Sequence, residues 1–140
     1  MIKDKDNKIL VGGQKLRNLG SDRHTEDIDY ICYDNTTNEA FITSDKVDYL
    51  NAASDSYAGR FFNEVLGSID NEATPQALLE LKAFAFVQHC QNFNWQKVDA
   101  SEYDIKFLVR NFNLTDVEIV KNYISEGEYT EVKKIINNVK

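Results

Sequence analysis

The chain has 140 residues, which suits one domain with one hydrophobic core, and 42% of them are hydrophobic. Its net charge of −7 disfavours non-specific binding to nucleic acids, because such binding needs lysine and arginine to neutralise phosphates. No apolar run reaches the ~18 residues of a membrane span, and no secretory signal is recognisable, so no membrane partner is expected. Cys32 and Cys90 lie in separate apolar segments, as expected of reduced core residues in a cytoplasmic protein.

The first half of the chain is expected to build a small mixed β-sheet. Gly20 suits the end of a short helix, and Ser44-Asp45 suits the start of a longer one. The expected elements are a strand at 7–12, a helix at 13–19, a strand at 27–33, a strand at 39–43 that pairs with it, a helix from 45 to 67 broken near 54–56, and a brief edge strand at 68–70.

The second half is expected to be helical. Thr74-Pro75 is a typical helix start, and the segment 77–90 is apolar almost all round, which is typical of a buried helix. Three further helices are expected. The first covers 101–111, the second begins at a capping box of Thr115 and Glu118 and ends at Gly127, and the third covers 132–139. The order predicts one α+β domain, 1–140, with a sheet-bearing part at 1–72 and a helical part at 73–140.

Residues 12–29 carry the clearest functional signal. Gly12 and Gly13 follow an apolar run, and glycine lets backbone N–H groups approach a phosphate without hindrance from Cβ. Asp27 and Asp29 begin the next apolar run, where alternation puts them on one face, ~6–7 Å apart, able to hold Mg²⁺. The pattern favours a nucleoside triphosphate site, with a plain turn and two solvated aspartates as the alternative.

Lys82 is the only lysine or arginine between Thr74 and Gln96, inside an otherwise apolar helix. A buried lysine is costly unless its charge is paired. Its ammonium group is expected either to reach the surface along the helix or to extend into a cleft toward phosphate.

Residues 9–33 resemble the nucleotidyltransferases of the DNA polymerase β type. The features that match are Gly12-Gly13, Gly20, Arg23, Thr25 and Asp27-Ile28-Asp29. This form is most similar to small bacterial AbiEii-like and related minimal nucleotidyltransferases, many of which occur in toxin–antitoxin or phage-defence loci. The resemblance implies a sheet of the nucleotidyltransferase type, Mg²⁺ on the two aspartates, and Arg23 and Thr25 facing the nucleotide.

The resemblance is looser over residues 74–112. It implies that Lys82 contacts the nucleotide and that Asp104 orients the acceptor or acts as its base. Lys97 and Asp99 match the same downstream element, but the spacing from Asp99 to Asp104 is longer than in the family, and Asp99 also suits a helix cap.

The chief departure is the third carboxylate that this family usually takes from a later strand. Glu39 and Asp70 are the candidates, and neither lies in a convincing apolar–acidic–apolar segment. The expected function is transfer of a nucleoside monophosphate from an NTP to a protein, tRNA or small-molecule acceptor. A catalytically inactive nucleotide-sensing or protein-binding module is the alternative, with a partner protein from a neighbouring gene, and a plain interaction domain is a third reading.

Overall fold

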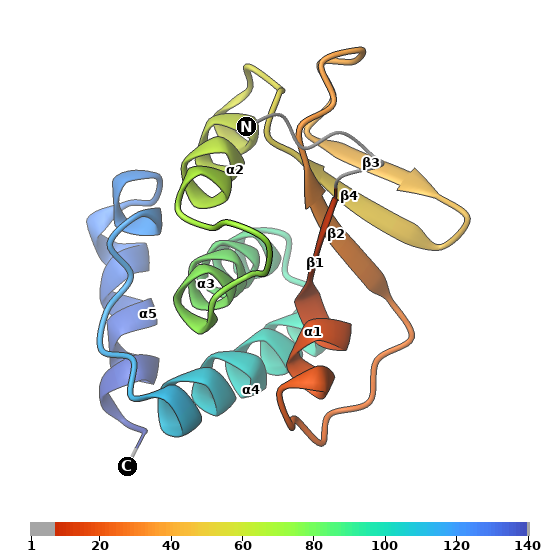
Figure 1. Cartoon of the computed structure of the whole chain (residues 1–140). Coiled ribbons are helices and arrows are strands. Elements are labelled where there is room, and N and C mark those ends of the chain that lie inside the picture. Colours follow the sequence, from red (N-terminus) through yellow and green to blue (C-terminus); the bar gives the residue numbers. More distant parts are fainter. Residues whose placement is uncertain (1–7, 140) are drawn as a thin grey trace. The chain divides into compact units, whose positions relative to one another are not determined.

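The computed structural model describes residues 8–139, and the chain divides into two compact units, Met1–Thr74 and Pro75–Lys140, which are described separately. Over the described residues the first unit contains β1 (Ile9–Val11), α1 (Gly12–Asn18), β2 (Ile28–Cys32), β3 (Phe41–Ser44), β4 (Val47–Asn51) and α2 (Tyr57–Gly67) (Figure 1). The second contains α3 (Pro75–Gln91), α4 (Trp95–Phe112), the 3₁₀ helix η1 (Val120–Asn122) and α5 (Glu126–Asn137). The expected α+β class is confirmed, with strands in the first unit and helices alone in the described part of the second.

The four strands of the first unit form one mixed sheet in the order β1-β2-β4-β3. β2 is antiparallel to β1 and parallel to β4, while β3 and β4 form an antiparallel hairpin. The prediction that the strand at 39–43 pairs with the strand carrying the aspartates is therefore wrong, since β4 lies between them. β4 also replaces the first part of the predicted 45–67 helix, and residues 68–70 form no strand.

A two-residue turn explains why the helix prediction failed. Asp45 and Lys46, which connect β3 to β4, both adopt left-handed backbone conformations, with φ of 51° and 64°. Such a turn matches the twist of a hairpin, and its usual residues are asparagine or aspartate followed by glycine. Because lysine takes the place of that glycine, Ser44-Asp45 resembles a helix cap in sequence although it leads into a tight turn.

One face of the sheet carries the apolar core of the first unit. Direct pairing places Ile9, Ile31, Leu50 and Phe41 in one row across the four strands. α2 packs on this row through Phe62, whose ring meets Phe41 edge-on with centroids 5.5 Å apart. Ser56 caps α2 by accepting a hydrogen bond from the Gly59 N–H at 3.1 Å, so the expected break near 54–56 is the start of this helix.

The second unit is built on the pairing of α3 with α4. The prediction of a buried helix is confirmed, because Leu78 and Leu79 are almost fully buried. α4 begins at Trp95, six residues before the predicted start, and Asn94 caps it. Within residues 8–139 no helix combines the length and the apolar character that crossing a membrane requires.

The capping box predicted at Thr115 and Glu118 is wrong, and the next one along the chain is real. Ser125 accepts a hydrogen bond from the Glu128 N–H, and the Glu128 carboxylate accepts one from the Ser125 N–H. Gly127 therefore lies inside α5 and ends no helix. The segment before α5 is fixed instead by tertiary hydrogen bonds to α3, which no local pattern reveals.

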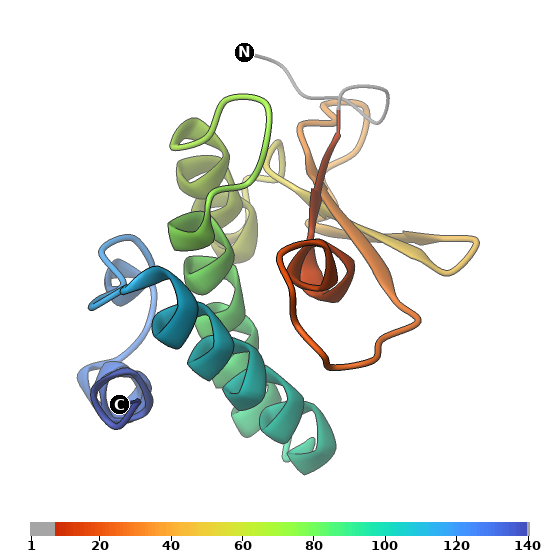
Figure 2. The ribbon, with the colours of Figure 1, turned by 60° about the horizontal axis from the view of Figure 1, so that its bottom comes forward.

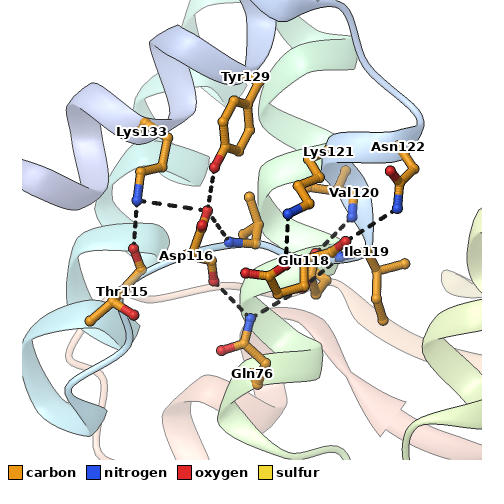
Figure 3. A network of polar contacts seen from close by, with 12 residues as sticks. Gln76, Thr115, Asp116, Glu118, Ile119, Val120, Lys121, Asn122, Tyr129 and Lys133 are labelled. Carbon is orange, nitrogen blue, oxygen red and sulfur yellow. Dashed lines mark hydrogen bonds and ion pairs between the residues drawn. The ribbon is translucent and has the colours of Figure 1, made fainter.

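Glu80 of α3 makes these bonds. Glu80 is only 1% exposed, and its carboxylate accepts hydrogen bonds from the N–H groups of Ile119 and Val120, the latter at 2.8 Å, and from the Gln76 side chain at 3.1 Å. Figure 3 labels these three donors. Loss of hydration on burial raises the pKa of Glu80 above 4.5, although these hydrogen bonds act in the opposite direction.

Asp116 joins the same segment to α5. It accepts hydrogen bonds from the Tyr129 hydroxyl at 2.6 Å and from the Val117 N–H, and Lys133 lies 3.7 Å from its carboxylate (Figure 3). Burial acts to raise the pKa of Asp116, but these partners outweigh it and the net shift is downward. The hydrogen bond to Asp116 raises the pKa of Tyr129 to about 12.

Glycine at position 46 should stabilise the first unit. Lys46→Gly removes the left-handed strain of about 1–2 kcal/mol and adds about 0.5–1 kcal/mol of backbone entropy cost. The expected net gain of about 0.5–1 kcal/mol in the free energy of unfolding can be measured by urea titration. Ser44→Gly, just outside the turn, should instead lower stability. A loss of stability in Lys46→Gly would contradict the turn conformation.

Glu80→Gln should flatten the dependence of stability on pH. A carboxyl group with a raised folded pKa favours folding when protonated. Its stabilisation is complete below pH 4.5 and is lost as the pH rises through the folded pKa. Glutamine cannot lose a proton, so this part of the profile should disappear when unfolding is followed by urea titration from acidic to neutral pH. An unchanged dependence of stability on pH would contradict burial as the dominant influence on the pKa of Glu80.

Candidate functional site

The sheet brings two aspartates together on one face. Asp29 of β2 is the direct partner of Asp48 of β4, and Val11 and Thr43 continue the same row to the outer strands. Paired residues of adjacent strands point to the same side, with the strands about 4.8 Å apart. Both aspartates are half-buried. Asp29 and Ile31 are two residues apart in β2, so this row lies next to the apolar row on the same face of the sheet. The carboxylates therefore border the core.

The predicted glycine pair lies against the predicted site residues. α1 follows β1 directly along the ribbon (Figure 2). Gly12 is its first residue, with φ of 72°. A Cβ added there would overlap the Asp29 carboxylate and lie 3.0 Å from its Cγ. A Cβ on Gly13 would lie 3.0 Å from Cβ of Thr25. Both positions therefore need glycine because of what they contact, and Gly12 needs it for its backbone conformation as well.

Side chains of α1 hold the segment that leads to β2. Gln14 donates a hydrogen bond from Nε2 to the Thr25 carbonyl oxygen at 2.9 Å, and Arg17 donates one to the Arg23 carbonyl oxygen at 3.2 Å. The Thr25 hydroxyl accepts a hydrogen bond from the Asp27 N–H at 3.3 Å. Thr25 is thus held next to Gly13, whereas the backbone of Arg23 is bound to Arg17 in the later part of α1.

Asp27 lies just before β2 and is exposed, whereas Asp29 is inside the strand. Among residues 8–139, no three His, Cys, Asp or Glu side chains come close enough to hold a metal ion together. Mg²⁺ usually takes one or two carboxylates and completes its shell with water and substrate phosphates. The Asp29–Asp48 pair therefore fits an ion that arrives with a triphosphate, and does not fit a permanent structural metal.

Asp48 is the residue that the sequence interpretation missed. The third carboxylate was sought at Glu39 and Asp70, which are both exposed and lie outside the strands. The run Val47-Asp48-Tyr49 has the apolar–acidic–apolar pattern of a functional strand, so a signal was present. It was hidden because Ser44-Asp45 was interpreted as a helix cap.

Lys82 and Asp104 lie in the second unit, where they contact each other. The Lys82 ammonium group is 2.9 Å from Oδ2 of Asp104, with side-chain exposures of 16% and 1%. The lysine therefore forms an ion pair that joins α3 to α4. The sequence predicted its ammonium group at the surface or in a cleft, and did not indicate this ion pair. Lys97 and Asp99 are exposed in the first turns of α4.

No protein-family model matches the chain, and none of the curated proteins or solved structures compared with it matches either. The resemblance to nucleotidyltransferases is therefore an interpretation of the motif residues between positions 9 and 33, and no comparison identifies the family.

Substitution of Gly12 tests the close approach of backbone and carboxylate. Gly12→Ala adds left-handed strain of about 1–2 kcal/mol to an overlap with Asp29 of about 1–3 kcal/mol. We expect a loss of about 2–5 kcal/mol in the free energy of unfolding. Gly20→Ala is the matched control, because Gly20 also has a positive φ, of 108°, but a Cβ there meets no atom within 4 Å. Equal losses in the two variants would show that the Asp29 contact contributes nothing.

Proposed function

We propose that the first unit carries the active site of a Mg²⁺-dependent nucleotidyltransferase. The reaction transfers a nucleoside monophosphate from an NTP to an acceptor hydroxyl. The observation that carries the proposal is the contact of the Gly12 backbone with the Asp29 carboxylate, with Asp48 directly beside it. A position able to cradle phosphate thereby adjoins carboxylates able to hold the metal.

The chain's own residues have distinct roles in this proposal. Asp29 and Asp48 would hold the metal. The backbone amides of Gly12 and Gly13 receive the β- and γ-phosphates, and Arg23 adds positive charge. Bound magnesium supplies charge neutralisation at the attacking and leaving oxygens.

The chemistry is one in-line substitution. The acceptor oxygen attacks the α-phosphorus, the bond to the bridging oxygen breaks, and pyrophosphate leaves with that electron pair. The proton of the acceptor hydroxyl passes to a carboxylate base. We assign this role to Asp48 in preference to Asp104, because Asp104 is fully buried and faces Lys82. Contact between Lys82 and the nucleotide would require that ion pair to open.

Within this proposal, we assign the chain to the AbiEii-like minimal nucleotidyltransferases. Support comes from the spacing of the glycine pair and the aspartates, and from two aspartates on adjacent parallel strands. A partner protein encoded by a neighbouring gene, as in toxin–antitoxin or defence systems, belongs to the same proposal. Candidate acceptors are a protein, the end of a tRNA and a small molecule.

Two observations favour the second candidate, a catalytically inactive nucleotide-sensing or protein-interaction module on the same fold. Asp27 is exposed, and no group of three metal-binding side chains forms among the described residues. A site with two carboxylates can bind a magnesium nucleotide without completing a two-metal arrangement. Binding and transfer must therefore be measured separately.

Asp29→Asn and Asp48→Asn should each lower nucleotidyl transfer at least about 100-fold without unfolding the chain. Transfer is measured as pyrophosphate release and as label from α-³²P-labelled NTPs. Binding is measured as thermal stabilisation by Mg²⁺ with each NTP, and a ligand at ~100 times its Kd adds ~2.7 kcal/mol. The matched control is Asp70→Asn, which changes an exposed aspartate outside the sheet.

The outcomes separate the two candidates. Stabilisation of the wild-type chain without transfer to any acceptor would favour the inactive module. If no NTP stabilises the wild-type chain, both candidates are wrong. Full transfer activity in Asp29→Asn would contradict the mechanism, and a loss confined to Asp70→Asn would place the third carboxylate there.

A further inference from the structure

Thr43 of the edge strand β3 contacts one of the proposed metal-binding carboxylates. Its hydroxyl donates a hydrogen bond from Oγ1 to Oδ1 of Asp48 at 2.6 Å. The two residues are direct partners in the β3–β4 pair. Thr43 belongs to none of the motifs that suggested the function, and the bond joins the outermost strand to the site.

The hairpin fixes this contact. The two-residue turn at Asp45 and Lys46 sets the register, so Ser44 pairs with Val47 and Thr43 pairs with Asp48. Directly opposed residues have Cβ atoms about 4.5–5.5 Å apart, which is within reach of a hydroxyl and a carboxylate. Threonine is also restricted about χ1, which limits the directions that its hydroxyl can take.

An aspartate carboxylate rotates broadly about χ2 unless a partner holds it. A short O–H···O⁻ bond is among the stronger hydrogen bonds of proteins, and here it engages one oxygen of Asp48. Groups that orient metal ligands in this way typically change metal affinity 10–100-fold when they are removed.

We propose that Thr43 is a positioning residue, whose hydroxyl holds the Asp48 carboxylate in the orientation that binds the metal beside Asp29. The inference rests on the proposed function of this site. A purely structural bond would contribute to the stability of the hairpin and leave metal affinity unchanged, so affinity is the quantity that distinguishes the two roles.

The test compares Thr43→Val, which keeps the β-branched shape and loses the hydroxyl, with Thr43→Ser, which keeps the hydroxyl. Mn²⁺ binding to the full chain is followed by electron paramagnetic resonance, alone and with a non-hydrolysable ATP analogue. We expect Thr43→Val to weaken Mn²⁺ binding about 10-fold or more and Thr43→Ser to stay within about 2-fold of wild type. Circular dichroism verifies that each variant is folded.

Asp48→Asn provides the second comparison. If Thr43 acts through Asp48, adding Thr43→Val to Asp48→Asn should cause little further loss of Mn²⁺ affinity. A full additional 10-fold loss in the double variant would overturn the positioning role. Equal affinity of wild type and Thr43→Val would also overturn it while leaving the proposed function intact. If the wild-type chain binds no Mn²⁺ under either condition, the proposed function itself fails.

Discussion

The backbone of Gly12 lies against the Asp29 carboxylate, and the arrangement of β1, α1 and β2 depends on this contact. The chain passes from β1 into α1 without a connecting loop, which requires the positive φ of Gly12. Val11 pairs with Asp29 in the adjacent strand, so the start of the helix and the carboxylate meet. Any side chain at position 12 would have to displace the aspartate or the helix.

The strand register carries this constraint across the sheet. Asp29 aligns with Asp48 in the parallel pair, and Asp48 aligns with Thr43 in the hairpin. Residues 1–74 contain fourteen acidic and eight basic side chains, a net charge of −6. A free triphosphate would be repelled by such a surface, whereas one carrying a divalent cation brings the missing positive charge. Under the proposed function, a nucleotide would therefore reach these carboxylates as its metal complex.

Local signals predicted the parts of the fold that local interactions determine. The sequence indicated the first strand, α1, β2 and the buried α3 because glycine, proline and apolar periodicity act within a few residues. Two features escaped prediction. The first is β4, which pairs with β2 across a crossover and follows a turn without asparagine or glycine, so that the sequence did not indicate Asp48 as a strand residue. The second is the segment near Val120, which is held by Glu80, forty residues earlier. Similarly, the sequence marked Lys82 as unusual and the family resemblance pointed to Asp104, but their pairing depends on how α3 and α4 pack.

The central claim is that Gly12, Gly13, Asp29 and Asp48 form one site for a metal-bound triphosphate. The most direct measurement is the paramagnetic broadening of backbone amide resonances by Mn²⁺ with a non-hydrolysable ATP analogue, titrated into the ¹⁵N-labelled full chain. The account predicts that the amides of these four residues broaden first and together, with Mg²⁺ in excess reversing the effect. Broadening that spares Gly12 and Asp29, or that begins at the glutamates of α5, would contradict it.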